Sequence, residues 1–336
     1  MPTSHPEPRF PSTSRRQFLG LMAAAGLIAA CGDDKKATAG GEDAAGGSVD
    51  TKPPATRTVQ TDGGPLQVPT DPKRVVAAIG SFETDVVAVG VMPVLTTTFA
   101  GPWVELDDSV VITKNIPPTA EELANVRPDL IIGWNWVTAE PSFEQIKQVA
   151  PYVGLGETAA TAGPGFDGSQ AMRSWDTLFL SVCDAVGRRP QGEKLVAELE
   201  ARLADLAERR KGRPPVSVAR IEFHEAGKFS YRGQNEDTAE LMRRIGLTVV
   251  GPAKIENDQS LERLPEIKSD WLVIPVGNDN IPRSVYDDVA ATRLFKAIPA
   301  VKAGRVHLVD ANLWPGLGHL WARKLVDDLE RLFVKA

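Results

Sequence analysis

The sequence predicts an α/β protein of two lobes, each with a mainly parallel sheet, bridged by one long α-helix. Short apolar runs alternate with amphipathic segments along most of the chain, which is the pattern of parallel sheets covered by helices. A helix-to-strand junction recurs in both halves with the same spacing. Between the halves, Ser169–Gly187 carries apolar residues at positions i, i+3, i+4 and i+7, as an amphipathic helix does.

The N-terminus has the features of an export signal. Ser14–Leu19 contains the paired arginines of twin-arginine export, and the apolar run Phe18–Ala30 is shorter than the ~20 residues that cross a bilayer. The run ends in Ile28–Cys31, a sequence at which bacterial lipoproteins are cleaved and lipidated. We therefore expect residues 1–30 to be a signal peptide and Cys31 to anchor the protein on the outer face of the cytoplasmic membrane. A plain N-terminal anchor with an incidental cysteine is the alternative.

Composition limits the possible partners. Residues 31–55 are rich in Gly, Ala, Asp, Lys and Thr and are expected to form a flexible tether. The net charge is −6, and no basic stripe with interleaved aromatics indicates a nucleic-acid partner. Besides Cys31 the chain has only Cys183, so the lipidated protein should contain no disulfide. We expect a monomer.

The first predicted lobe, residues 56–168, opens with a hairpin at Thr56–Val68 whose turn contains Asp62-Gly63-Gly64-Pro65. Strands and helices then alternate. The expected strands are 75–79, 93–99, 130–132 and 152–155, and the expected helices are 82–89, a capped helix from 119 and 143–149.

The second predicted lobe, residues 188–336, repeats this plan. Its expected elements are helices at 191–211 and 237–245, strands at 216–223, 270–274 and 306–309, and a closing helix. Glu121 precedes Asp129 by eight residues, and Glu262 precedes Asp270 by eight, with an apolar strand after each Asp. The repeat favours two Rossmann-like lobes, with chance similarity of two ordinary junctions as the alternative.

Several of these segments, taken in order, carry a resemblance to a known family. They are Pro72–Val76, Glu121–Leu123 with Pro128–Ile132, the second-lobe counterpart, and Leu294–Val306 with the helix after it. Over about residues 56–334 the chain resembles the substrate-binding lipoproteins of iron–siderophore and cobalamin ABC importers. Ser269 departs from the family pattern, which has Pro there. The resemblance implies a rigid helical linker and a ligand in the cleft between the lobes.

Ligands of parallel sheets bind beyond the carboxyl ends of the strands, and the candidate residues follow strands. Aromatic faces can bury the apolar rim of an iron chelate, and Arg232 is the first choice for an anionic group. Burial in the core is the alternative for each tryptophan, and it is the expectation for Trp175 and Trp271. The candidate ligand-binding residues are Phe82, Trp103, Trp134, Trp136, His224, Tyr231, Arg232 and Trp314.

The resemblance also implies partners. Glu121 and Glu262 match the family's exposed glutamates that dock onto the permease, although each could be an ordinary capping residue. The expected ligand is a ferric siderophore, carried as cargo to ABC permease and ATPase subunits, with no intrinsic cofactor.

Haem or cobalamin is the alternative ligand, and a cleft enzyme or metallo-reductase is disfavoured. His224, His307 and His319 are scattered without metal-ligand spacing. Gly163–Gly168 matches a dinucleotide motif formally but does not follow a strand. No catalytic residue and no metal site are expected.

Overall fold

The computed structural model describes residues 55–61, 63–78, 82–97, 104–156, 175–225, 227–316 and 318–335. The expected signal peptide, Cys31, nearly all of the tether and Trp103 lie outside these ranges. So does the first part of the helix predicted at Ser169–Gly187. Among the described helices, none is long and apolar enough to cross a membrane.

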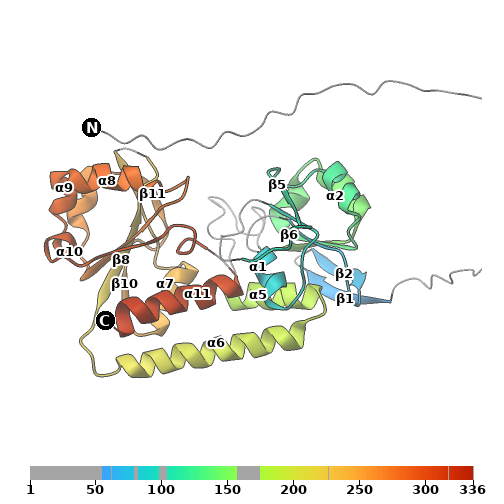
Figure 1. The fold of residues 1–336 in the computed structure, drawn as a ribbon, viewed down its shortest axis with the longest axis horizontal. Helices are drawn as coiled ribbons and strands as arrows, with labels where there is room; N and C mark the ends of the chain where they lie inside the picture. The colour runs from blue at the N-terminus through green and yellow to red at the C-terminus, as the bar shows by residue number, and fades with distance from the viewer. Residues whose placement is uncertain are drawn as a thin grey trace, which may run out of the picture. The chain divides into compact units, whose positions relative to one another are not determined.

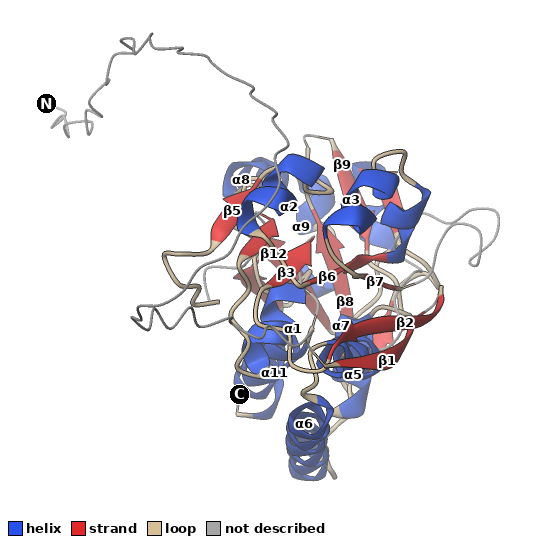
Figure 2. Cartoon of the chain, turned by 90° about the vertical axis from the view of Figure 1, so that its right-hand side faces the viewer, coloured by secondary structure: helices blue, strands red, loops and turns tan. Residues whose placement is uncertain are grey.

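The hairpin at the start of the first lobe is confirmed. Strands β1 (Thr56–Thr61) and β2 (Gly64–Pro69) pair antiparallel in full register. Val59 and Val68 point into the core of the first lobe, and the hairpin lies beside β7 (Figure 2).

The first lobe is built on a five-stranded parallel sheet in the order β5-β4-β3-β6-β7. Alternate residues of β3 face opposite cores: Val75 and Ala77 meet α1 and α5, whereas Val76 and Ala78 meet α2 and α3. Burial on both faces explains the continuous apolar runs in the sequence. The strands are β3 (Val75–Ala78), β4 (Leu95–Thr97), β5 (Val111–Thr113), β6 (Leu130–Trp134) and β7 (Tyr152–Leu155). The helices are α1 (Phe82–Ala88), α2 (Ala120–Val126), the 3-10 helix η1 (Asn135–Ala139) and α3 (Phe143–Val149).

The second lobe has a six-stranded mixed sheet. β12 lies between β8 and β13, parallel to both, and β10 runs parallel to the first half of β8. β9 pairs antiparallel with the last residues of β8, and β11 pairs antiparallel with β9. The strands are β8 (Ser217–Glu222), β9 (Lys228–Tyr231), β10 (Thr248–Val250), β11 (Glu256–Ser260), β12 (Trp271–Val276) and β13 (Val306–Asp310).

Helices cover both faces of this second sheet (Figure 1). One face packs on α6 (Arg189–Arg210), α7 (Asp237–Arg244), α11 (His319–Leu329) and the π-helix η3 (Glu330–Val334). The other face packs on the 3-10 helix η2 (Leu261–Glu266), α8 (Arg283–Ala291), α9 (Arg293–Lys296) and α10 (Pro299–Lys302).

The repeated Asp has the same structural role in both lobes. Asp129, just before β6, accepts hydrogen bonds from the backbone N–H groups of Lys73 (2.7 Å) and Arg74 (2.9 Å), just before β3. Asp270, just before β12, accepts from the backbone N–H (2.8 Å) and hydroxyl (2.7 Å) of Ser217 at the start of β8. In each lobe the aspartate therefore joins two adjacent parallel strands at their amino ends, which explains the repeat physically.

The longest described helix between the two lobes is α6, with 22 residues, and it follows the predicted linker Ser169–Gly187 in the chain. Of the latter, the structure describes α5 (Trp175–Ala185). Its Phe179 and Val182 pack into the first-lobe core that contains α1, whereas Trp175 packs into the second-lobe core that contains α6, α7 and α11. α6 packs against α5 at Gly192 and against the second core further along. Both helices contact both lobes, and α5 has the stronger apolar stripe, whereas α6 has a long exposed face.

The end of the chain returns to the first lobe. The first residue of α11, His319, donates its backbone N–H to Asp85 of α1 at 2.7 Å, and its ring stacks on Phe179 of α5. Gly318 makes this approach possible, because a Cβ there would lie 2.6 Å from the Asp85 carboxylate oxygen. Asp85 and His319 are both buried.

Candidate ligand site

Three polar residues alternate at the carboxyl end of β8. Arg220, Glu222 and His224 project from the same face because alternate residues of a strand point the same way. Arg220 and Glu222 are 4% and 1% exposed, whereas His224 is exposed. A charged pair inside an otherwise apolar strand is costly unless it is fully partnered, so the stability of this strand depends on the groups around the pair.

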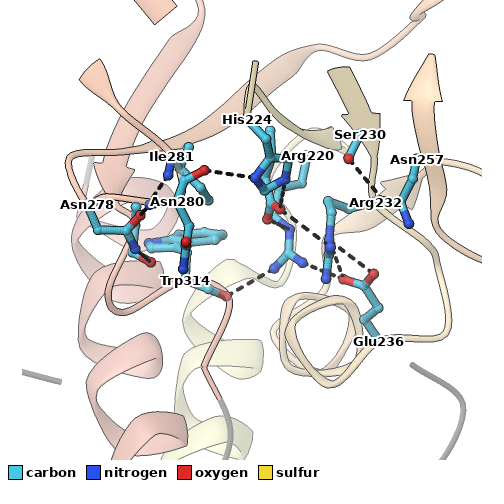
Figure 3. A network of polar contacts seen from close by, with 12 residues as sticks. Arg220, His224, Ser230, Arg232, Glu236, Asn257, Asn278, Asn280, Ile281 and Trp314 are labelled. Atoms are coloured by element: carbon cyan, nitrogen blue, oxygen red, sulfur yellow. Dashed lines mark hydrogen bonds and ion pairs between the residues drawn. The ribbon is translucent and has the colours of Figure 1, made fainter. Parts of the chain in front are cut away.

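Two arginines and two glutamates form what we call the Arg–Glu network: Arg220, Glu222, Arg232 and Glu236. Figure 3 shows Arg220, Arg232 and Glu236 of this network. Arg220 forms a short ion pair with Glu236, and its Nε lies 3.7 Å from Glu222. Arg232 lies 3.1 Å from Glu236 and 3.4 Å from Glu222. Each guanidinium therefore faces both carboxylates, and the four charges balance.

Neighbouring groups add hydrogen bonds to the Arg–Glu network, although Arg220 Nε and Glu222 Oε1 have no hydrogen-bond partner among the described residues. Arg220 Nη1 donates to the carbonyl oxygen of Trp314 at 3.0 Å, and the Thr238 hydroxyl donates to the same oxygen at 3.1 Å. Glu236, immediately before α7, also accepts from the backbone N–H of Gly233 at 3.2 Å. These contacts fix the arginines to the loop before α11 and to the start of α7.

His224 lies at the exposed end of the Arg–Glu network. Its Nε2 is 3.4 Å from Glu222 Oε2, and its Nδ1 is 3.0 Å from the carbonyl oxygen of Asn280. Both neighbours are acceptors, so the doubly protonated ring satisfies both, and the bond to Glu222 raises the pKa of His224 against the effect of its partial burial. Burial alone would raise the pKa of Glu222, but His224 and the two arginines hold it below its ordinary value.

The loop after β12 holds the partner of His224 in place. Asn278 Oδ1 accepts from the backbone N–H groups of Asn280 (3.1 Å) and Ile281 (2.8 Å), and its Nδ2 donates to the Ala311 carbonyl oxygen at 2.9 Å. The loops after β8, β9, β12 and β13 therefore meet in one set of polar contacts (Figure 3).

A cavity of about 10 Å³ lies beside Arg220, Arg232, Glu236 and Thr238. A space of this size accommodates at most a single water molecule. It is far too small for an iron chelate, so this cavity does not enclose one.

The first lobe contributes aromatic side chains at the end of β6. Trp134 is partly buried, with its ring centroid 4.9 Å from that of Phe82. Tyr152 Oη donates to the carbonyl oxygen of Trp134 at 2.9 Å, and Gly133 leaves room for it, since a Cβ there would lie 2.3 Å from this hydroxyl. Trp134 and Trp136 both pack against the apolar cluster that contains α2 and α3, and Trp134 also packs against the cluster on the other face of the sheet. The strand alternation ends at Asn135, where the chain turns into the 3-10 helix η1.

Several predicted ligand residues are placed in the cores. Phe82 and Trp314 are both 0% exposed, and the Trp314 ring donates its Nε1–H to Asp328 at 3.0 Å. Their predicted contact with a ligand is therefore corrected, because neither ring is exposed to solvent in this structure. Tyr231 is partly buried and packs on the opposite face of the sheet from Arg232, near Phe229.

The structure brings together His224 and Arg232, and it leaves Trp134 and Trp136 partly exposed in the first lobe. Sequence reasoning missed Arg220, Glu222 and Glu236. The alternation of Arg220, Glu222 and His224 in an apolar strand was the available signal. The expectation that Trp175 is a core residue is confirmed at 1% exposure, and Trp271 is partly buried and stacks on His307.

The repeated glutamates occupy matching positions. Glu121 lies in the first turn of α2 and Glu262 in the first turn of η2, and both are exposed. Neither makes the capping contact itself: in α2 the capping box is formed by Thr119 and Glu122, and in η2 the Ser260 hydroxyl accepts from the backbone of Glu262.

Within the described residues, no group of three or more His, Cys, Asp or Glu side chains is arranged to hold a metal ion.

Comparison with known proteins identifies the family. The sequence model of the periplasmic binding protein family matches residues 76–313. A probable siderophore-binding lipoprotein of Bacillus subtilis, YfiY, is 26% identical over 302 residues, which cover 83% of this chain and 88% of the relative. The Fe(3+)-citrate-binding protein YfmC of the same species is 25% identical, with coverage of 80% and 82%.

Solved structures show the same fold. Staphylococcus aureus SirA complexed with staphyloferrin B superposes with a TM-score of 0.65 at 19% identity, covering 82% of this chain and 98% of SirA. A periplasmic solute binding protein of Mycobacterium smegmatis gives 0.67 at 21% identity, with coverage of 83% and 98%. With two α/β lobes and a family match across most of its length, this chain belongs to the periplasmic binding protein family.

Proposed function

We propose that this protein captures a ferric siderophore outside the cytoplasm and delivers it to an ABC importer. The observation that carries the proposal is the buried Arg–Glu network, with His224 exposed at its end, where the loops after the parallel strands of the second lobe meet. Ligands of parallel sheets bind at this edge. Family membership and relatives that are named for siderophore and ferric citrate binding support it.

In this proposal the Arg–Glu network positions the groups that contact the ligand. The exposed edge of Arg232 donates hydrogen bonds to oxygen atoms of the chelator. His224, whose two ring nitrogens face Glu222 and Asn280, contacts the ligand through its exposed ring edge, and the buried carboxylates keep both side chains oriented. Trp134 and Trp136 supply apolar surface from the first lobe. Iron is cargo inside its chelate.

Tryptophan fluorescence titration tests the proposal. Ferric siderophores should quench the fluorescence saturably, and Arg232→Ala and His224→Ala should each weaken binding about tenfold, the loss expected for one or two hydrogen bonds. Lys147→Ala, an exposed change on α3, is the control and should bind as wild type. A Soret shift with haem and no response to any ferric chelate would contradict the proposal.

Delivery is proposed to use Glu121 and Glu262. Both are exposed in the first turn of a short helix, one in each lobe, so each can meet a positively charged pocket of a permease. The double variant Glu121→Ala/Glu262→Ala should bind ligand as wild type but fail to support uptake of radioactive iron by cells. Unimpaired uptake would remove this role.

Export by the twin-arginine route and lipid anchoring at Cys31 complete the proposal, and they rest on the sequence of residues 14–31. Cys31→Ser should shift the protein from the membrane fraction to the soluble fraction, whereas Cys183→Ser should leave it in the membrane fraction. Retention of the Cys31→Ser protein in the membrane would refute anchoring through this cysteine.

A further inference from the structure

The charges at the proposed site indicate which class of iron complex it accepts. Its two central arginines are already neutralised, because Arg220 and Arg232 each face both Glu222 and Glu236. A strongly anionic ligand would have to compete with these buried carboxylates for the same guanidinium groups. Displacing them would leave buried negative charges without partners, which is costly.

The rest of the edge supplies no excess of positive charge. Lys228 pairs with Glu225 at 2.8 Å and with Asp258 at 3.7 Å. The described charged residues at or just after the strands of this edge include five cations and five anions. The cations are Arg220, Lys228, Arg232, Lys254 and the doubly protonated His224, and the anions are Glu222, Glu225, Glu236, Asp279 and Asp310. In the first lobe, the described charged residues in the loops after β4 and β6 are carboxylates, among them Glu105 and Glu140.

What the site does offer is a free hydrogen-bond donor. Arg232 uses Nε and Nη1 for its carboxylates, and its Nη2 has no partner among the described residues. The Arg232 side chain is 20% exposed, whereas the ring nitrogens of His224, which is 42% exposed, already face Glu222 and Asn280. A directed donor on an arginine whose charge is neutralised suits an uncharged ligand that is rich in carbonyl oxygens.

These properties match one chelate chemistry. Three singly charged hydroxamates neutralise ferric iron, and their complexes carry outward-facing amide carbonyls, whereas three doubly charged catecholates leave a triply negative complex and ferric citrate is also anionic. We infer that the site, if it binds a ferric siderophore as proposed above, selects uncharged or cationic trihydroxamate complexes over anionic ones.

The test measures dissociation constants for four iron complexes on the same protein. Ferrichrome is uncharged, ferrioxamine B is cationic, and ferric enterobactin and ferric citrate are anionic. The inference requires that at least one hydroxamate complex binds ten times more tightly than both anionic complexes. Equal or tighter binding of an anionic complex would overturn the inference and leave the proposed function standing. No binding of any ferric complex would overturn both.

A charge variant tests the cause of the selectivity. Glu236→Gln retains a hydrogen-bond acceptor for Gly233 but removes one negative charge from the Arg–Glu network. It should weaken the binding of ferrioxamine B and strengthen the binding of ferric enterobactin. The ratio of the two affinities should change at least tenfold in favour of ferric enterobactin. Glu144→Gln, which removes the same charge from an exposed position on α3, should leave the ratio unchanged.

Folding of each variant is verified by its thermal unfolding transition. If Glu236→Gln does not fold, Asp279→Asn on the exposed loop after β12 should shift the ratio in the same direction. A folded variant with an unchanged ratio would show that the Arg–Glu network does not set the charge preference.

Discussion

At the scale of single residues, the proposed site depends on buried ion pairs between arginine and glutamate. Arg220 and Glu222 are deeply buried, and an isolated ion there would be strongly unfavourable. The pairing with Arg232 and Glu236 makes burial tolerable and fixes the direction of each side chain. His224 is the member of this set whose ordinary pKa lies closest to neutral, and its hydrogen bond to Glu222 raises that pKa.

Glu222→Gln should lower the pKa of His224 towards its ordinary value, because the side chain that raises it loses its charge. NMR titration of the histidine rings measures this shift directly. His307, whose pKa is lowered by burial against Trp271, lies outside the Arg–Glu network and should titrate as in wild type. An unchanged His224 titration would refute the assigned contact.

Sequence reasoning found the fold better than the site for a reason visible in individual residues. Runs such as Leu130–Ile132 are buried on both faces, so their continuous apolar composition is enough to predict a buried strand. The role of Trp314 is not local: its ring fills a core while its carbonyl oxygen holds Arg220. No pattern in the sequence separates such a tryptophan from one that lines a ligand surface.

At the scale of elements, two short strands with mostly exposed or polar side chains escaped prediction. β5 exposes two of its three residues, and β11 consists of Glu, Asn, Asp, Gln and Ser. Both lie at the edge of a sheet, where one side needs no apolar partner. The capping motif of α2, by contrast, was predicted, because it uses only neighbouring residues.

Thr119→Ala should destabilise the protein by about 1 kcal/mol, the usual loss for an N-cap side chain. Thr119 Oγ1 accepts from the Glu122 backbone, and the Glu122 carboxylate in turn accepts from the backbone and hydroxyl of Thr119, from Thr113 and from Asn115. Urea unfolding measures the change.

Ser142→Ala is the matched control, since Ser142 stands at the N-cap of α3 without a side-chain capping bond and its loss should change little. Equal effects of the two substitutions would contradict the capping assignment.

At the scale of the whole molecule, α5, α6 and α11 join the two lobes. Asp85 of α1 and His319 of α11 are 234 positions apart and meet in a buried contact. Burial raises the pKa of Asp85 to about 8, and burial lowers the pKa of His319 to about 4, so both side chains are uncharged near neutral pH.

Asp85→Asn should remove a pH dependence of stability. Below pH 3.8 Asp85 is protonated in both folded and unfolded chains; as the pH rises towards about 8, the unfolded chain releases this proton first, so wild-type stability falls. The asparagine side chain keeps an acceptor for the backbone N–H of His319 but does not titrate. Relative to wild type, the variant should therefore gain stability steadily between pH 6 and 8 in urea unfolding.

Asp287→Asn, on the exposed face of α8, is the control for this comparison and should show no such trend. A constant difference between wild type and Asp85→Asn over the same range would exclude a buried protonated carboxyl at this contact.

The reactivity of Cys183 should report how often α5 and α6 separate. Its thiol is buried against Gly192, and burial raises its pKa, so alkylating reagents should reach it only when the two helices part. With Cys31 blocked by lipid or replaced by serine, the rate of alkylation at Cys183 would measure the frequency with which α5 and α6 separate in the native protein.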